Sequence, residues 1–357
     1  MAASKTGTGL NSKIAMQSCP RSVDDLDELL ASPSGTLVRE IKSVQGPLVI
    51  LGAGGKMGPS LAVLARRAAR MAGHELEVIA VSRFKDPTQR KWLEEREVKT
   101  IACDLFDAGA VAKLPRSSNL IYLVGLKFGT SSNPTATWAA NTVIPGLVVQ
   151  QYPNARMVVL STGNVYPFVP VSGGGALETD PLTPVGEYPN AAVARERLFE
   201  WHAEKQGTKL TILRLNYAVD LRYGVPHDIA RMVWSGKAID VANGHFNCIW
   251  QGDANEIILR SLSHAASPPV VLNLTGPEIV SVRAAARELA VGMGCHPRFI
   301  GVESKTALLS NSSRMHKLLG APRTSVRQML AWTAAWVMLG GRSFNRPTHF
   351  EVRDGRF

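Results

Sequence analysis

Apolar and polar residues alternate regularly between residues 47 and 223. Short apolar runs, each of the length of a buried strand, are separated by longer segments in which apolar residues recur with a helical period. Such an alternation is typical of parallel βαβ units. It predicts an α/β protein with a doubly wound parallel sheet, whose strands are Leu48–Ala53, Leu76–Val81, Lys99–Ala102, Asn119–Val124, Met157–Ser161 and Leu210–Leu215.

The segment before residue 47 has a different pattern. Residues 1 to 21 show no helical or alternating period, which predicts a tail. Ser22 is a candidate N-cap for a helix over Val23–Leu30, because acidic residues crowd the first turn that follows it. A second helix over Thr36–Val44 is expected to pack against the main domain. Residues 1–46 therefore form an extension of a tail and short helices.

After residue 223 the alternation weakens. Residues 224–345 are expected to form a smaller, mostly helical lobe, partly interleaved with the sheet, which includes helices over Val280–Met293 and Ser325–Leu339. Residues 346–357 are expected to be a C-terminal tail. The Pro/Gly-rich stretch from Pro167 to Pro184 predicts a long loop, and long loops in compact domains tend to border active sites.

Composition restricts the class of protein. With 45% hydrophobic and 19% charged residues the chain is globular, and no apolar run reaches the roughly 18 residues of a membrane span. The start of the chain has no apolar core of signal-peptide length, so a cytoplasmic protein is expected. The four cysteines are widely spaced without a CxxC pair, which indicates neither a disulfide framework nor a metal site.

The net charge of +11 is unevenly placed. Residues 314–357 carry eight Lys/Arg against two acids, whereas residues 1–46 carry five of each. No run of five or six basic residues occurs and no aromatic residues are interleaved with them, which disfavours nucleic acid as a partner. Anionic substrates and phosphates account equally well for the basic end.

The sharpest motif follows the first predicted strand. Gly52, Gly55 and Gly58 stand at GxxGxxG spacing, with Lys56 and Met57 between them, and a helical stretch begins at Ser60. Glycine is needed where the chain turns tightly, where its backbone approaches a pyrophosphate and where the helix packs closely on the strand. The strand, glycine turn and helix together predict a Rossmann-type dinucleotide-binding domain over residues 47–223.

The second predicted strand indicates which dinucleotide binds. An NAD site normally has Asp or Glu at the end of this strand, and here Ser82 and Arg83 follow Val81. A hydroxyl followed by a guanidinium suits a 2′-phosphate. The sequence therefore favours NADP over NAD.

With these motifs in hand, residues 47 to 340 resemble the extended short-chain dehydrogenase/reductases of the NAD(P)-dependent epimerase/dehydratase family. The segment Ser161-Thr162-Gly163-Asn164-Val165-Tyr166 is close to the family's catalytic serine/threonine motif, and Glu178-Thr179-Asp180-Pro181 precedes Tyr188 as the family's segment precedes its catalytic tyrosine. The resemblance implies catalytic roles for Thr162 and Tyr188. It also implies cofactor contacts from Asp104, Leu105, Val124, Gly125 and Asn141.

The chain departs from the family at one catalytic position. The family has Tyr-x-x-x-Lys, and this chain has Ala192 four residues after Tyr188, while Glu196 still stands where the family has a glutamate. Without a nearby cation little phenolate forms at neutral pH, because an unperturbed tyrosine titrates near 10. Lys127, Arg195 and the oxidised nicotinamide itself could supply the charge, although an exposed salt bridge on the helix surface is the favoured interpretation of Arg195.

The sequence leads to three functional hypotheses. The first is an NADP-dependent oxidoreductase or epimerase acting on a sugar or nucleotide sugar. Its candidate substrate contacts are Asn164 and, at the carboxyl end of the sixth predicted strand, Arg214 and Asn216. The second is a catalytically weakened NADP-binding sensor or scaffold, suggested by Ala192. The third is an RNA-binding member of the superfamily. The resemblance also implies a homodimer.

Overall fold

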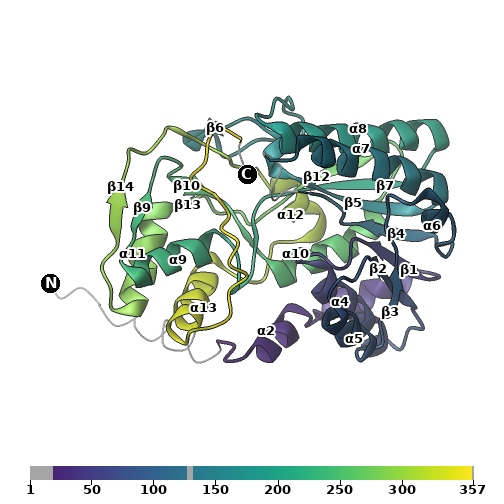
Figure 1. Cartoon of the computed structure of the whole chain (residues 1–357), viewed down its shortest axis with the longest axis horizontal. Helices are drawn as coiled ribbons and strands as arrows, with labels where there is room; N and C mark the ends of the chain where they lie inside the picture. Colours follow the sequence, from purple (N-terminus) through teal and green to yellow (C-terminus); the bar gives the residue numbers. More distant parts are fainter. Residues whose placement is uncertain (1–18, 127–131, 356–357) are drawn as a thin grey trace.

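The computed structural model describes residues 19–126 and 132–355. At its centre is a sheet of seven parallel strands in the order β12-β7-β5-β4-β1-β2-β3 (Figure 1). The sheet confirms the predicted doubly wound α/β architecture. Its strands are β1 (Leu48–Leu51), β2 (Val78–Ser82), β3 (Lys99–Ala102), β4 (Asn119–Tyr122), β5 (Arg156–Thr162), β7 (Leu210–Leu215) and β12 (Val270–Leu274).

Six of these strands lie where the apolar runs predict them, and β12 does not. It comes from the later part of the chain, where the alternation of strands and helices is weak. It joins the sheet as an edge strand, pairing in parallel with β7 from Val270 opposite Thr211 to Leu274 opposite Leu215. The C-terminal lobe and the sheet are thus interleaved.

Both faces of the sheet are covered, so the central strand β1 is apolar throughout. All residues of β1 are buried: Leu48 and Ile50 pack on one side and Val49 and Leu51 on the other. The helices on the first side are α4 (Gly58–Met71), α5 (Pro87–Glu94), α10 (Gln251–Arg260) and α12 (Ser313–Leu319), and those on the second are α6 (Ala108–Ala112), α7 (Pro134–Gln151) and α8 (Glu187–Gln206).

The smaller lobe lies beside the carboxyl edge of the sheet (Figure 1). Its core is formed by α9 (Val225–Ser235), α11 (Val282–Met293) and α13 (Val326–Met338), and the last two confirm the predicted helices. Trp250 and Trp332 meet edge to face in this core, with ring centroids 5.3 Å apart. Short strands complete it: β8 (Ala218–Val219), β9 (Ala238–Asp240), β10 (His245–Phe246), β11 (Ile249–Trp250), β13 (Val280–Ser281) and β14 (Arg298–Ile300).

The N-terminal extension is folded onto both parts. Helix α2 (Val23–Leu30) begins at the predicted cap, where Ser22 accepts a hydrogen bond from the Asp25 amide at 3.0 Å, and its Leu26 and Leu30 are buried in the core of the lobe. The predicted second helix is shorter than expected, because α3 (Gly35–Glu40) tightens into a 3₁₀ turn, η1 (Ile41–Ser43).

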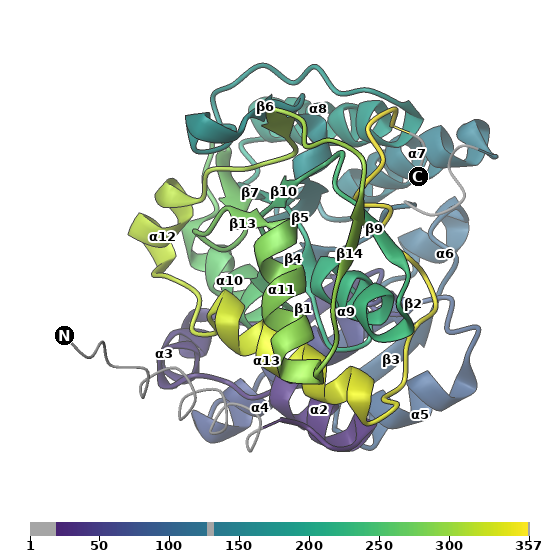
Figure 2. The ribbon, with the colours of Figure 1, turned by 90° about the vertical axis from the view of Figure 1, so that its left-hand side faces the viewer.

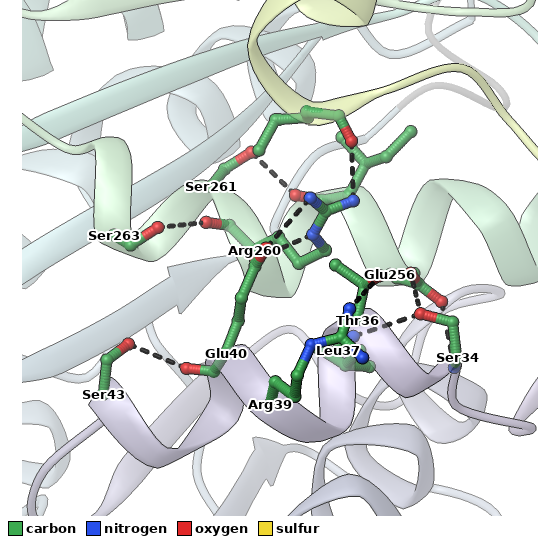
Figure 3. Close-up of polar contacts among 12 residues, drawn as sticks. Ser34, Thr36, Leu37, Arg39, Glu40, Ser43, Glu256, Arg260, Ser261 and Ser263 are labelled. Atoms are coloured by element: carbon green, nitrogen blue, oxygen red, sulfur yellow. Dashed lines mark hydrogen bonds and ion pairs between the residues drawn. The ribbon is translucent and has the colours of Figure 1, made fainter.

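Side chains of α10 hold this extension in place (Figure 3). Arg260 reaches Glu40 at the end of α3, with its Nε 2.8 Å from a carboxylate oxygen, and also donates to the Leu319 carbonyl. One turn earlier, Glu256 accepts hydrogen bonds from the amide and hydroxyl of Ser34, the N-cap of α3. The extension is therefore bound to the main domain at both ends of α3.

The C-terminal segment also packs on the folded domain. After α13 the chain runs over the lobe towards the start of α8 (Figure 2). Thr348 donates to the Asp228 carboxylate from both its amide and its hydroxyl, and Arg353 donates to the Thr306 carbonyl at 2.8 Å. At Gly186 an added Cβ would lie 2.4 Å from the carbonyl oxygen of Gly355. The end of the described chain thus packs directly before α8.

Among the described residues, no helix combines the length and the apolar character that crossing a bilayer requires. The four cysteines form no disulfide, and three of them are buried.

Candidate functional site

A cavity of about 860 Å³ lies at the carboxyl ends of the central strands. On one side of β1 the sheet continues with β2 and β3, and on its other side it continues with β4, β5, β7 and β12. The strand order therefore reverses between β1 and β4. In open α/β sheets such a switch point is where ligands bind. Residues at or just after the ends of β1, β4, β5 and β7 all contribute to the wall, which includes Gly52, Val124, Thr162 and Asn216.

The glycines after β1 form a tight turn in which side chains would collide with neighbouring atoms. Gly52 has φ +81°, and a Cβ there would lie 3.0 Å from the Val124 amide nitrogen. At Gly58, the first residue of α4, a Cβ would lie 2.3 Å from the Ala53 carbonyl oxygen. Glycine at these positions lets α4 approach β1 closely. The N-terminus of α4 lies at the cavity, where its partial positive charge favours an anion. Five predicted residues line this part of the cavity: Gly52, Gly55, Lys56, Met57 and Gly58.

The region beyond β2 differs in part from the prediction. Ser82 packs against Gly54 and Arg83 is exposed, and neither lines the cavity. The wall is instead formed by the start of α5, where Asp86 is the N-cap and accepts hydrogen bonds from the amide and hydroxyl of Thr88. These bonds, and more weakly the charge of Arg342, lower the pKa of Asp86. The sequence signal for this wall is the Asp86-Pro87 helix start.

Two further predicted cofactor contacts lie away from the wall. Asp104 is exposed after β3 and accepts a hydrogen bond from the Phe106 amide at 3.1 Å. Leu105 is buried in the core beneath the sheet. Neither residue lines the cavity, whereas Val124 and Gly125 do.

At the other end of the cavity the structure brings together the predicted catalytic residues. Thr162 ends β5 and Tyr188 lies in the first turn of α8, and both line the cavity together with Asn164 and Asn216. The Thr162 hydroxyl accepts a hydrogen bond from the Asn164 amide at 3.2 Å, which fixes the turn after β5. Lys127, the other predicted catalytic residue, lies outside the described residues.

The position of the absent lysine is closed to the cavity. Ala192 is completely buried in a small cluster with Val165, Tyr166 and Ala176, so its side chain faces the protein. Arg195, one turn further along α8, does line the cavity.

The expectation of an exposed salt bridge at Arg195 is wrong. The side chain is only 2% exposed, and its Nη1 donates to the Val124 carbonyl at 3.1 Å and to Asn141 Oδ1 at 2.7 Å. Because Arg195 and Tyr188 are seven residues apart, they share the face of α8 that packs on the sheet. Asn141, predicted as a cofactor contact, is fully buried and does not line the cavity; its side-chain oxygen accepts the hydrogen bond from Arg195.

Arg214 is also placed differently from the prediction. It lies behind the wall, buried in an ion pair with Glu196, and its Nη1 donates to the Tyr166 hydroxyl at 2.7 Å. Burial raises the pKa of Tyr166 to about 12. The Pro167–Pro184 loop covers this pair through the Glu178 carbonyl, and none of the loop's residues lines the cavity.

Two terminal segments complete the wall, and local sequence patterns did not reveal them. Asp24 and Asp27 come from α2, and Arg342, Phe344 and Arg346 come from the segment after α13. Arg222 joins the two segments: it pairs with Asp27 at 2.8 Å and with Asp220 at 2.9 Å, and its guanidinium lies 4.9 Å from the centre of the Phe344 ring. Burial raises the pKa of Asp27, and the charge of Arg222 opposes this shift.

Several solved structures share this fold. UDP-glucose 4-epimerase of Thermotoga maritima, solved with UDP-glucose, superposes with a TM-score of 0.66 at 15% identity over 82% of this chain and 99% of its own. The same enzyme of Thermus thermophilus, solved with NAD, gives 0.65 at 18% identity over 81% of this chain and 98% of its own. The dTDP-glucose 4,6-dehydratase DesIV of Streptomyces venezuelae gives 0.70 at 16% identity over 82% and 97%.

A comparison with curated protein sequences finds no match. The family model described as "NAD dependent epimerase/dehydratase family" matches residues 48–256, a range that runs from the start of β1 into α10, the helix that anchors the N-terminal extension. The motifs, the switch-point cavity and this match agree, and the chain belongs to the NAD-dependent epimerase/dehydratase family.

Proposed function

We propose that the protein is an NADP-dependent oxidoreductase or epimerase that acts on a sugar or nucleotide sugar by hydride transfer. One observation carries the proposal: the glycine turn, Thr162 and Tyr188 line a single cavity. The nicotinamide ring of the coenzyme would supply or accept the hydride, and the protein would supply binding, orientation and proton transfer.

The residues at the glycine turn suit a dinucleotide. Side chains are excluded at Gly52, Gly54 and Gly58, so backbone amides and the N-terminus of α4 are free to approach a diphosphate. The choice of NADP is supported by Arg342, which shares the cavity wall with Asp86, and by the sequence position of Arg83, which follows β2 but is exposed and lies outside the wall. An arginine near the adenosine ribose accommodates a 2′-phosphate.

Tyr188 and Thr162 would handle the proton and the reacting oxygen. A tyrosine hydroxyl within hydrogen-bond reach of a substrate carbonyl or hydroxyl can give or take its proton, and a threonine hydroxyl can orient the same oxygen. Asn164 brings an amide group to the same wall, which suits the many hydroxyls of a sugar. The Asn216 side chain also lines the wall, but its amide nitrogen is already bonded to Asn247 and to the Leu308 carbonyl, which leaves its oxygen as the group for a substrate. The nucleotide sugars named with the epimerase and dehydratase structures support this substrate class.

A second candidate is an NADP-binding sensor or scaffold with little catalytic activity. The observation that favours it is Ala192, which places a buried methyl group where the family has an ammonium. In this case the coenzyme would bind tightly and no substrate would be turned over.

The resemblance to the epimerase/dehydratase family leads us to propose a homodimer through α7 and α8. Both helices expose large apolar side chains, with Val143 49% and Trp201 58% exposed. Light scattering of the purified chain at several concentrations tests this assembly.

The deciding experiment has two steps. NADPH and NADH are first titrated by fluorescence, and absorbance at the nicotinamide band is then followed with a panel of sugars and nucleotide sugars. Turnover that falls by roughly two to four orders of magnitude in Tyr188→Phe supports the catalytic proposal. Turnover that survives Tyr188→Phe refutes the assignment of Tyr188, and tight binding without turnover supports the sensor.

A further inference from the structure

Arg195 is a buried positive charge without an acidic partner. Its side chain is 2% exposed, yet no carboxylate of the described residues pairs with it. Its Nε is buried and has no hydrogen-bond partner. A buried cation is costly unless it is paired, so its presence on a cavity wall indicates that the partner is a ligand.

The guanidinium is held in place by neutral groups. Nη1 donates to the Val124 carbonyl and to Asn141 Oδ1, and Asn141 is itself oriented because its Nδ2 donates to the Thr137 carbonyl at 2.8 Å. Gly125 provides the space, since a Cβ there would lie 2.9 Å from Nη1. These contacts fix the position of the charge without neutralising it.

The location of Arg195 within the cavity narrows the choice of ligand group. Its partner Val124 follows β4 and lies against Gly52 of the glycine turn. Asp86 and Thr88, at the start of α5, line the cavity on the β2 side of that turn, whereas α8 brings both Tyr188 and Arg195 to the β4 side. A dinucleotide lying across the turn with its adenosine towards α5 would present its other half to Arg195.

We infer that Arg195 binds the phosphate on the nicotinamide side of the coenzyme and thereby positions the ring at Tyr188 and Thr162. The inference rests on the proposed function and adds to it a positioning residue. In this inference, Arg195 supplies the positive charge on the face of α8 where Ala192 stands in place of the family's lysine.

Binding to the free protein gives a test that does not depend on turnover. Three ligands are compared by competition with NADPH fluorescence: reduced nicotinamide mononucleotide, which carries the phosphate in question, reduced nicotinamide riboside, which lacks it, and adenosine 2′,5′-bisphosphate, which contains only the other half. Arg195→Met should weaken NADPH and the mononucleotide by roughly ten- to a hundredfold, because a hydrogen bond between two charged groups is lost. The riboside and the bisphosphate should bind as to the wild type.

Two further variants separate the charge from the fold. Arg195→Lys should retain part of the affinity for the mononucleotide, and Gly125→Ala should weaken it by displacing the guanidinium while leaving the charge in the chain. These variants decide the question if Arg195→Met does not fold. Arg197→Met is the matched control, because Arg197 lies on the same helix, is 62% exposed at its side chain and pairs only with Glu200 among the described residues.

The outcomes distinguish the two proposals. A wild-type protein that binds neither NADPH nor NADH refutes the proposed function, and with it this inference. If the wild type binds NADPH and the Arg195 variants bind all three ligands unchanged, or lose the bisphosphate as strongly as the mononucleotide, only the role of Arg195 is overturned.

Discussion

Arg214 on β7 and Glu196 on α8 form an ion pair that is almost completely removed from solvent, with 2.8 Å between Arg214 Nη2 and Glu196 Oε2. Arg214 Nε also donates a hydrogen bond to the same carboxylate oxygen, at 3.1 Å. Glu196 also accepts a hydrogen bond from the hydroxyl of Ser161, the residue before Thr162. The pair therefore ties α8, which carries Tyr188, to the ends of β5 and β7.

Removing one member of this pair should destabilise the protein strongly. We expect Arg214→Met to lower the free energy of unfolding by about 3–5 kcal/mol, because Glu196 would remain as a buried charge without a cation beside it. The double variant Arg214→Met/Glu196→Gln should lose less than the sum of the two single variants. Urea unfolding measures all three, and additive losses would show that the two side chains are not coupled.

The sheet and the glycine turn could be predicted from the sequence because their determinants are local. A buried parallel strand needs a short apolar run, and Gly52 and Gly58 reveal themselves by spacing and by the helix that follows. The departure at Ala192 was visible for the same reason. Residues Thr162 and Tyr188 were identified through motifs that also lie within short stretches of chain.

Features that depend on distant contacts could not be predicted in the same way. The period of α8 places Arg195 on the face that carries Tyr188, but its burial depends on Val124 and Asn141, which come from other elements. Likewise, nothing near Arg222 in the sequence indicates that it joins α2 to the segment containing Phe344. Strand β12 was missed because one apolar run in a helical region carries no period of its own.

The close approach of α4 to β1 predicts different effects for two helical glycines. Gly58→Ala would place a Cβ 2.3 Å from the Ala53 carbonyl oxygen, so we expect a loss of roughly 1–3 kcal/mol in stability and weaker NADPH binding. Gly146→Ala on α7 is the control, since no atom lies within 4 Å of a Cβ built there and the residue does not line the cavity. Thermal unfolding and fluorescence titration would contradict the packing argument if both variants behaved alike.

Arginines from two distant parts of the chain should decide the choice of coenzyme. Arg342 lines the cavity with Asp86, and Arg83 follows β2 at an exposed position outside the cavity wall. We expect Arg83→Ala and Arg342→Ala each to weaken NADPH roughly tenfold and NADH hardly at all, because only NADPH has the 2′-phosphate. Arg314→Ala, an exposed change on α12, serves as the control. Equal losses for both coenzymes would argue against a 2′-phosphate site here.

The wall formed by the two terminal segments should depend on Arg222. Arg222→Met removes the pairs with Asp27 and Asp220 and leaves the partly buried Asp27 and the buried Asp220 without this cation. We expect faster hydrogen exchange in α2 and in residues 342–346, together with weaker binding of NADPH. Unchanged exchange in both segments would show that Arg222 does not hold them.

His227 on α9 should make stability depend on pH in mildly acidic solution. The side chain is 3% exposed, its Nε2 lies 3.0 Å from the Ser343 hydroxyl, and burial, followed by the charge of Arg231, lowers its pKa from 6.5 to about 4.

Between these two pKa values the unfolded chain takes up a proton that the folded protein does not, so the free energy of unfolding falls as the pH drops from about 6.5 towards 4. The shift corresponds to a loss of roughly 3 kcal/mol from this residue at the acid end.

His227→Gln keeps a polar group near Ser343 but cannot titrate, so its stability should fall less over this pH range. His296→Gln, at an exposed position, should follow the wild type. Urea unfolding at a series of pH values measures the three slopes, and a His227→Gln slope equal to that of the wild type would assign the acid sensitivity to other groups. The neutral state of His227 would then have no measurable effect on folding, despite its burial between α9 and the segment that carries Ser343.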